Sequence, residues 1–204
     1  MSKENIIPLL IFLAIGGLIV VLILVLQPKM NPQGNESQSN IRFQEAVGQI
    51  APNFTLSDIN DEKVTLSDLK GKIVVLFFSE GLRCYPACFD QVIKLSEDPR
   101  LNTDEIESFS VVLDSPKSWQ SQKKNYPAIS DTKILFDNGG NVSQKYNVLS
   151  LPSSMQKGLY PGHTYFVIDK DGIIRYTLDD PRMGLRNDLL AEEIEKLNEA
   201  DNIQ

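Results

Sequence analysis

Cysteine is scarce in this chain. The 204 residues include two, Cys84 and Cys88, which lie four positions apart. Two cysteines are too few for a scaffold held together by disulfides, and a bond between such close neighbours would constrain only a short loop. Internal repeats and long low-complexity segments are absent as well. We therefore expect the two cysteines to serve chemistry rather than to hold the fold together.

Positive charge is also in short supply. The chain has 20 lysine and arginine residues against 27 aspartate and glutamate residues, which gives a formal net charge of -7. An acidic surface repels the phosphate backbone of nucleic acids, so we expect no nucleic-acid partner. The length suits one folded domain of ordinary size after an N-terminal segment is set aside.

Charged residues are missing altogether from 6–26, which follows a short tail at 1–5. About 20 apolar residues span the hydrocarbon core of a bilayer as a helix. A cleavable signal peptide would have a shorter apolar stretch and a small-residue cleavage site, and a buried core helix would usually be interrupted by polar residues. We therefore predict an uncleaved transmembrane signal anchor at 6–26 and the membrane as a partner.

The anchor predicts a single-pass membrane protein with its soluble domain outside the cytoplasm. Lys3 and Lys29 lie on opposite sides of the apolar run, so the positive-inside rule does not set the orientation by itself. The polar residues of 28–40 cannot bury enough apolar surface to fold, and they predict a flexible tether. We assign the tether to 27–47 and the folded domain to 48–200.

The domain alternates between strand and helix patterns. Two short alternating runs at 51–56 and 64–66 predict an opening β-hairpin. Further strands are predicted at 73–78, 108–113, 133–136, 164–168 and 173–177, and helices at 87–95, 116–126, 142–146 and 189–197. This order predicts an α/β, thioredoxin-like fold, with a central mixed sheet flanked by helices and an N-terminal β-hairpin extension.

Both cysteines lie where a buried strand ends and a helix begins. Pro86 suits the first helical position, because the N–H that proline lacks would have no partner there. Cys84 would then lie in the loop and Cys88 in the first turn, where the helix dipole and nearby Arg83 favour a thiolate. We predict a redox pair in which the more exposed Cys84 attacks and Cys88 resolves. The alternative is two inert buried cysteines.

His163 is the only histidine, and it directly precedes a predicted strand. In a thioredoxin topology the loop before this strand packs beside the start of the catalytic helix. His163 could then reach the sulfurs as a base, a hydrogen-bond partner or a metal ligand. A surface or capping histidine is the alternative. Pro161 is a candidate for a cis peptide bond, with an ordinary trans turn proline as the alternative.

Four stretches of the chain together resemble a known family. The stretches are Ala51-Pro52-Asn53-Phe54-Thr55-Leu56, Leu66-Ser67-Asp68-Leu69-Lys70-Gly71-Lys72, the cysteine segment, and Thr164-Tyr165-Phe166-Val167-Ile168-Asp169-Lys170-Asp171-Gly172. They resemble the redoxin group, the AhpC/TSA peroxiredoxin-like and TlpA-like branch of the thioredoxin superfamily, over roughly residues 48–198. The resemblance implies cofactor-free, thiol-dependent redox work, either antioxidant reduction of a hydroperoxide or exchange with a protein thiol or disulfide.

Two departures separate the chain from the best-known members of this group. Peroxiredoxins of this type carry Pro-x-x-x-Thr/Ser-x-x-Cys, whereas Phe77 and Gly81 occupy those positions before Cys84. Thioredoxin-like exchangers usually have two residues between their cysteines, and this chain has three. The resemblance therefore predicts thiol redox chemistry more firmly than peroxidase activity.

A second resemblance concerns metal binding. Three residues between the cysteines, an N-terminal anchor and a downstream histidine are similar to the Sco family of copper-delivery proteins, in which two cysteines and one histidine bind copper. Soft thiolates and an imidazole suit copper. The alternative implied by this resemblance is copper bound by Cys84, Cys88 and His163 for delivery to a membrane partner, and we rank it second.

Overall fold

The computed structural model describes residues 40–201, with side chains described through 199. The predicted anchor at 6–26 and most of the predicted tether lie outside these residues. Within 40–201, no helix combines the length and the apolar character that a bilayer crossing needs.

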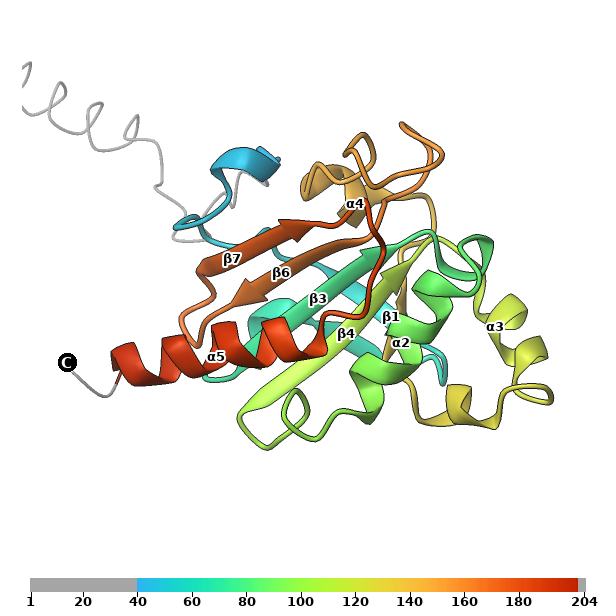
Figure 1. Ribbon diagram of the computed structural model, residues 1–204, viewed down its shortest axis with the longest axis horizontal. Helices are drawn as coiled ribbons and strands as arrows, with labels where there is room; N and C mark the ends of the chain where they lie inside the picture. The colour runs from blue at the N-terminus through green and yellow to red at the C-terminus, as the bar shows by residue number, and fades with distance from the viewer. Residues whose placement is uncertain (1–39, 202–204) are drawn as a thin grey trace, which may run out of the picture. The chain divides into compact units, whose positions relative to one another are not determined.

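Seven strands form one mixed sheet in the order β2-β1-β5-β4-β3-β6-β7 (Figure 1). The strands are β1 Thr55–Asp58, β2 Lys63–Thr65, β3 Ile73–Ser79, β4 Ile106–Val112, β5 Ile134–Phe136, β6 Thr164–Ile168 and β7 Ile174–Asp179. β3, β4 and β5 run parallel to one another, and the outer strands are antiparallel to their neighbours. The thioredoxin-like sheet and its opening hairpin are confirmed.

The helical segments follow the predicted order. They are η2 Phe43–Glu45, η3 Leu66–Leu69, η4 Gly81–Arg83, α2 Ala87–Glu97, α3 Pro116–Gln122, η5 Pro127–Asp131, α4 Asn141–Lys145 and α5 Asn187–Asp201. The prediction of one helix over 116–126 was too long. Pro127 disfavours the α conformation of Tyr126 before it, which has φ -133° and ψ 81°, so the chain turns and restarts as η5.

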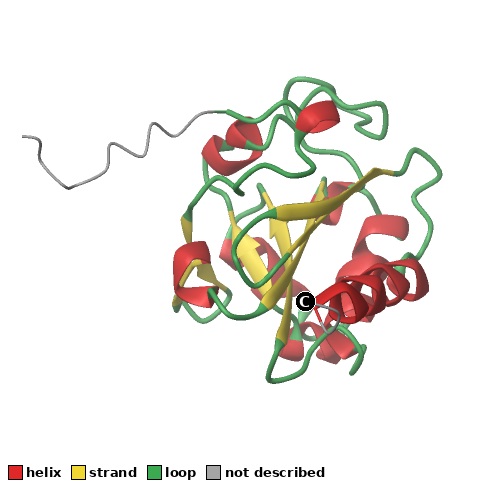
Figure 2. Cartoon of the chain, turned by 90° about the vertical axis from the view of Figure 1, so that its left-hand side faces the viewer, coloured by secondary structure: helices red, strands yellow, loops and turns green. Residues whose placement is uncertain are grey.

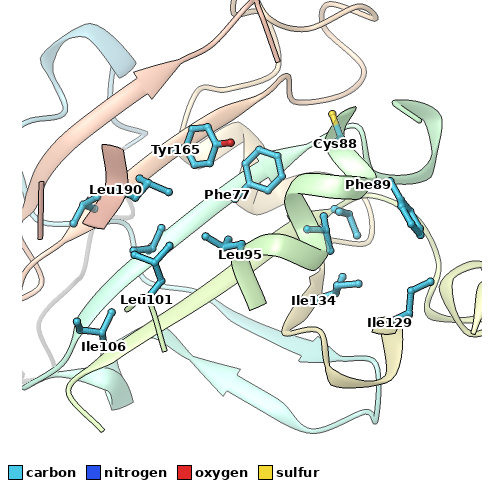
Figure 3. Packing of buried hydrophobic residues seen from close by; sticks show 14 of the residues in the cluster. Phe77, Cys88, Phe89, Leu95, Leu101, Ile106, Ile129, Ile134, Tyr165 and Leu190 are labelled. Atoms are coloured by element: carbon cyan, nitrogen blue, oxygen red, sulfur yellow. The ribbon is translucent and has the colours of Figure 1, made fainter. Parts of the chain in front are cut away.

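β3 is buried along its whole length because each of its faces supports a separate core. Ile73, Val75 and Phe77 pack with α2 and α5 on one face. The alternating residues between them pack on the other face with α4 and the N-terminal segment. Figure 2 shows the strands between helical segments, and Figure 3 shows the first of these cores, with α2 lying across β3 and β4.

The boundary between tether and domain lies earlier than predicted. Ile41 is 3% exposed and Ala46 is fully buried, and the Ile41 N–H donates to the Lys145 carbonyl over 3.0 Å. Phe43 packs edge-on against Phe166. The prediction of a tether through 47 is wrong for these residues, because the spaced apolar side chains of 41–46 give the chain a surface to bury against the sheet.

Candidate active site

The loop that carries Cys84 follows β3 and is held by a hydrogen bond to the side chain of Asp114. The Asp114 carboxylate accepts from the Leu82 N–H and from the Trp119 indole N–H, each over 3.0 Å. Gly81 adopts φ +59°, and a Cβ there would collide with the same carboxylate. These contacts therefore fix the conformation of the loop just before Cys84.

Cys84 and Cys88 form a disulfide, with their Cα atoms 5.3 Å apart. Cys84 lies in the loop between η4 and α2, directly after η4, and Cys88 is the second residue of α2, within its first turn as predicted. The expected difference in exposure is small, because Cys84 is 4% exposed and Cys88 1%. The predicted redox pair is therefore close enough to bond, but Cys84 is not an exposed side chain.

Two of the three residues predicted to support the cysteines, Pro86 and Arg83, occupy different places from those expected. Pro86 precedes α2 as its N-cap rather than filling its first position. Within the described residues, the cis peptide bond is Tyr85–Pro86, so the expected candidate Pro161 is not cis. The Arg83 guanidinium lies over the Tyr160 ring, 4.7 Å from its centroid, so it packs on that loop. A role for Arg83 in stabilising a thiolate stays a prediction.

The structure brings His163 to the second cysteine. His163 is fully buried at the start of β6, and its Nδ1 lies 3.5 Å from Cys88 Sγ. Its Nε2 lies 2.8 Å from the Tyr165 hydroxyl and 3.1 Å from the Gly184 carbonyl. Phe77 packs against both the imidazole and the Tyr165 ring, each with centroids 4.7 Å away. The surface-histidine alternative is thus excluded.

Both neutral tautomers of His163 have partners in this arrangement. Burial lowers the pKa of His163 from 6.5 to about 4, so the imidazole is uncharged at neutral pH. With the proton on Nε2, the ring donates to Gly184 and Nδ1 can accept from a Cys88 thiol. With the proton on Nδ1, the ring can donate to a Cys88 thiolate while Nε2 accepts from Tyr165. Burial raises the pKa of Tyr165 well above 10, so that hydroxyl keeps its proton.

A loop that sequence reasoning missed covers the disulfide from the other side. Met183 Sδ lies 3.7 Å from Cys84 Sγ, and the Gly184 carbonyl comes from the same loop. Buried Asp180 holds the loop by accepting from the Gly184 N–H and by an ion pair with Arg186 of 2.6 Å. An aspartate such as Asp180, whose side chain can accept from backbone N–H groups that follow it, is typical of a turn. Nothing in the local sequence connects this turn with Cys84.

A second missed residue, Glu80, joins the cysteine loop to the loop before β6. Its Oε1 accepts from the Met155 N–H over 2.6 Å and from the Gln156 N–H over 3.1 Å. Gly162 allows the loop before β6 to pack closely against its own residue Ser153, because a Cβ at position 162 would collide with Ser153. No sequence pattern indicated this role of Glu80, since its partners lie 75 and 76 positions away along the chain.

The donor set does not form a metal site in the disulfide state. Among residues 40–201, no three or more histidine, cysteine, aspartate or glutamate side chains are grouped so as to hold a metal ion. A bonded pair of sulfurs offers no thiolates, so any metal binding would require reduction first. Around the sulfurs, one imidazole and one thioether are the remaining soft donors.

Comparisons with known proteins find a family and relatives that work with thiols by their names. The model of the AhpC/TSA family matches residues 47–177. The chain is 31% identical over 130 residues to chloroplastic peroxiredoxin Q of Triticum aestivum, covering 63% of this chain and 57% of that protein. It is 33% identical over 129 residues to the thiol-disulfide oxidoreductase ResA of Bacillus thuringiensis, covering 62% and 65%. The matched parts thus span less than two thirds of these relatives.

A solved structure shows the same fold at lower identity. The reduced 2-Cys peroxiredoxin of Plasmodium vivax superimposes with a TM-score of 0.66 at 22% identity, covering 77% of this chain and 84% of that one. Since the family model covers well over half of the sequence and the cysteines lie within it, the chain belongs to the AhpC/TSA family.

Proposed function

We propose that the protein is a thiol–disulfide oxidoreductase that exchanges electrons with a protein partner through Cys84 and Cys88. The observation that carries the proposal is the placement of His163 Nδ1 3.5 Å from Cys88 Sγ, whereas the contact of Cys84 Sγ is with Met183. This placement gives the two sulfurs different roles. The relatives include both a peroxiredoxin and a thiol-disulfide oxidoreductase, so their names support thiol chemistry. They do not choose between a peroxide and a protein disulfide as the substrate, and that choice rests on the geometry of the site.

Reduction begins at Cys84. A partner thiolate attacks Cys84 Sγ, the Cys84–Cys88 bond breaks, and Cys88 leaves as a thiolate. The leaving thiolate accepts a hydrogen bond from Nδ1–H of His163, and the first turn of α2 adds the positive end of its dipole. The better stabilised sulfur is the better leaving group, so the structure favours attack on Cys84.

The reverse reaction uses the same groups. The Cys84 thiolate attacks a partner disulfide and forms a mixed disulfide. Cys88 then attacks Cys84 Sγ, and its thiol proton has Nδ1 of His163 as an acceptor while Nε2–H donates to Gly184. The second attack releases the partner as a dithiol and restores the Cys84–Cys88 bond.

Peroxide reduction is the less supported of the two family activities. The hydroxyl that peroxiredoxins place three positions before the attacking cysteine is replaced here by Gly81. A Cβ at that position would collide with the Asp114 carboxylate, and the backbone there has φ +59°. Cys84 Sγ is instead in contact with the Met183 thioether, which donates no hydrogen bond to a peroxide oxygen.

The test is a pair of turnover assays on the full-length protein. Reduced protein should reduce the disulfides of insulin at a rate that Cys84→Ser abolishes. Hydrogen peroxide should be consumed at least about ten times more slowly than insulin is reduced, a difference of about 1.4 kcal/mol in activation free energy. Rapid peroxide turnover with no insulin reduction would refute disulfide exchange as the function.

As a second candidate we propose copper binding by the reduced protein. Cys84, Cys88 and His163 are the ligands expected from the Sco resemblance, and the closeness of His163 to Cys88 supports them. Two thiolates and one imidazole suit Cu(I). Anaerobic titration of the reduced protein with Cu(I) tests the proposal. Stoichiometric binding that is lost in His163→Ala would support it, and no binding above that of Cys84→Ser would end it.

We also propose that residues 6–26 anchor the protein in a membrane and that the domain lies outside the cytoplasm. The support is the uncharged apolar run, whose length matches the hydrocarbon core. Membrane fractionation followed by alkaline extraction tests the anchor, and protease accessibility of the domain in intact cells tests its side. Release of the full-length protein by alkaline extraction would contradict the anchor.

A further inference from the structure

Exposed apolar side chains gather around the disulfide. In the described part of the chain, six large hydrophobic residues are more than half exposed. Four of them are 56 to 66% exposed and lie on loops around Cys84: Tyr85, Met155, Leu159 and Leu185. Burying such residues in water-free contact is favourable by about 25 cal/mol per Å². Their gathering at the reactive bond indicates a surface that another molecule covers.

Contacts within the structure connect all four residues to the site. Tyr85 follows Cys84, and Leu185 lies two residues after Met183, which contacts Cys84 Sγ. The Met155 N–H donates to Glu80, and Leu159 precedes Tyr160, on which Arg83 stacks. Figure 1 shows these segments at the same end of the sheet. We call them the docking loops: 81–86, 152–162 and 181–186.

A shallow groove lies beside the exposed ring of Tyr85. It has a volume of about 230 Å³ and is lined by Leu82, Tyr85, Phe89, Gln122 and Tyr126. The groove is mostly apolar and opens next to the cysteine loop, so it can take one large apolar side chain of a bound segment.

The docking loops are basic in an acidic protein. They carry Arg83, Lys157, Arg182 and Arg186 and contain no aspartate or glutamate, although the whole chain has more acidic than basic residues. Arg186 and Arg182 both pair with Asp180, Arg182 over 3.9 Å, and the side chains of Arg83, Lys157 and Arg182 are exposed. Positive charge at this surface attracts a negatively charged segment and repels a basic one.

We propose that the docking loops bind an extended protein segment in which a cysteine pair is flanked by large apolar and acidic residues. The inference rests on the proposed disulfide exchange and specifies its partner. A small hydroperoxide needs neither the apolar rim nor the cations, whereas a protein dithiol uses both. The groove beside Tyr85 takes an apolar residue next to the reacting cysteine, and the three exposed cations pair with the acidic residues.

The reaction of the bound segment is a two-electron exchange. Its first thiolate attacks Cys84 Sγ, forming a mixed disulfide and releasing Cys88. Its second thiolate attacks the segment's own sulfur in that mixed disulfide and releases Cys84. The segment loses two electrons and two protons and becomes a disulfide, and the protein gains them as the Cys84 and Cys88 thiols.

Three synthetic dithiol peptides test the proposal. They share one Cys-Gly-Ser-Cys centre and differ in their flanks, which hold Leu with Glu, Leu with Lys, or Ser with Glu. The rate at which each reduces the oxidised full-length protein is measured by acid quench and mass spectrometry, with dithiothreitol as a reference. At low salt we expect the Leu and Glu peptide to react about tenfold faster than either of the others, equivalent to about 1.4 kcal/mol.

Each outcome has a separate meaning. Equal rates for the three peptides, or faster reaction of the Lys peptide, would overturn the docking proposal while leaving disulfide exchange intact. Failure of every peptide and of dithiothreitol to reduce the Cys84–Cys88 bond would overturn the proposed function itself. The preference for Glu over Lys should shrink at high ionic strength, because exposed charges are screened.

A matched pair of double variants locates the surface. Met155→Ser with Leu185→Ser should lower the ratio of the peptide rate to the dithiothreitol rate by about fivefold, or roughly 1 kcal/mol. The control is Val47→Ser with Ile50→Ser, which changes the other two large hydrophobic residues that are more than half exposed. The control should leave the ratio unchanged. An equal loss in both double variants would contradict a surface at the docking loops.

Discussion

The two sulfurs of one disulfide lie in different surroundings. Cys88 lies beside His163, which directly precedes β6, and His163 in turn contacts Tyr165 within β6; both side chains are fully buried. Cys84 faces a connection between β7 and α5, where Met183 is its neighbour. His163 supplies Cys88 with a hydrogen-bonding nitrogen whose role depends on its protonation, whereas Met183 supplies Cys84 with an apolar contact. In the proposed reaction this difference distinguishes the leaving sulfur from the attacked sulfur, although the residues are only four positions apart.

The strongest test of this asymmetry compares the two single cysteine variants. Reduced Cys88→Ser should accumulate a mixed disulfide with a protein disulfide such as insulin, because Cys84 attacks and no second thiol resolves the bond. Cys84→Ser should accumulate far less, since Cys88 is enclosed by His163 and α2. Non-reducing electrophoresis with mass spectrometry measures both. Equal trapping by the two variants would remove the proposed distinction between the sulfurs.

The buried imidazole predicts a pH-dependent stability. The pKa of His163 is lowered by burial to about 4, below its value of 6.5 in the unfolded chain. Between these values the unfolded state binds a proton that the folded state does not, so the free energy of unfolding falls as pH is lowered from about 7 to about 4. The contribution is at most about 3 kcal/mol.

Urea denaturation of the oxidised protein and of His163→Gln across this pH range measures the contribution. The difference in unfolding free energy between the two proteins should decrease toward acid, while the titration of the carboxylates is common to both. A difference that stays constant from pH 7 to pH 4 would show that the histidine is protonated, or free to reach water, in the folded state.

Tyr165→Phe examines the surroundings of Cys88 more finely. Loss of the hydroxyl removes the donor to Nε2 of His163 and disfavours the tautomer that donates from Nδ1 to a Cys88 thiolate. One hydrogen bond contributes about 1 kcal/mol, so the pKa of Cys88 in the reduced protein should rise by less than about one unit. Alkylation rates as a function of pH measure it. Tyr126→Phe is the control, because that hydroxyl bonds to Tyr85, and a matching rise there would point to a nonspecific effect.

Met183→Ala examines the surroundings of Cys84 and should have the smallest effect. Shortening this half-buried side chain uncovers Cys84 Sγ, so reduction of the disulfide by dithiothreitol should accelerate about two- to threefold, or by about 0.5 kcal/mol. Met155→Ala is the matched control, since Met155 is 57% exposed and lies on a different loop, where its N–H donates to Glu80. An unchanged or slower rate in Met183→Ala would show that the thioether does not limit access.

The local features of the site were predictable from the sequence. A continuous apolar strand followed by Cys84, Pro86 and Cys88 predicted the junction at which the disulfide forms, and helical spacing predicted α2 to within two residues. The order of elements predicted the thioredoxin-like sheet. His163 could be connected with the sulfurs because the family topology places the start of its strand beside the catalytic helix.

Other features depend on contacts between distant segments. Glu80 has partners in another loop, and Met183 reaches Cys84 from 99 positions away. Neither residue belongs to a periodic pattern or a motif that marks it as part of a site. The exposure expected for Cys84 failed for the same reason, because the loop that covers it is brought there only when β7 pairs with β6.

The sequence by itself determined where along the chain the cysteine pair lies and that it stands between a buried strand and a helix, because propensity, apolar spacing and helix-terminus electrostatics act between near neighbours. Only the tertiary structure decided how the two sulfurs differ. Burial sets the protonation of His163, and the pairing of β3, β6 and β7 sets which atoms stand beside each sulfur. Both depend on the packing of residues far apart in the chain, which no local pattern specifies.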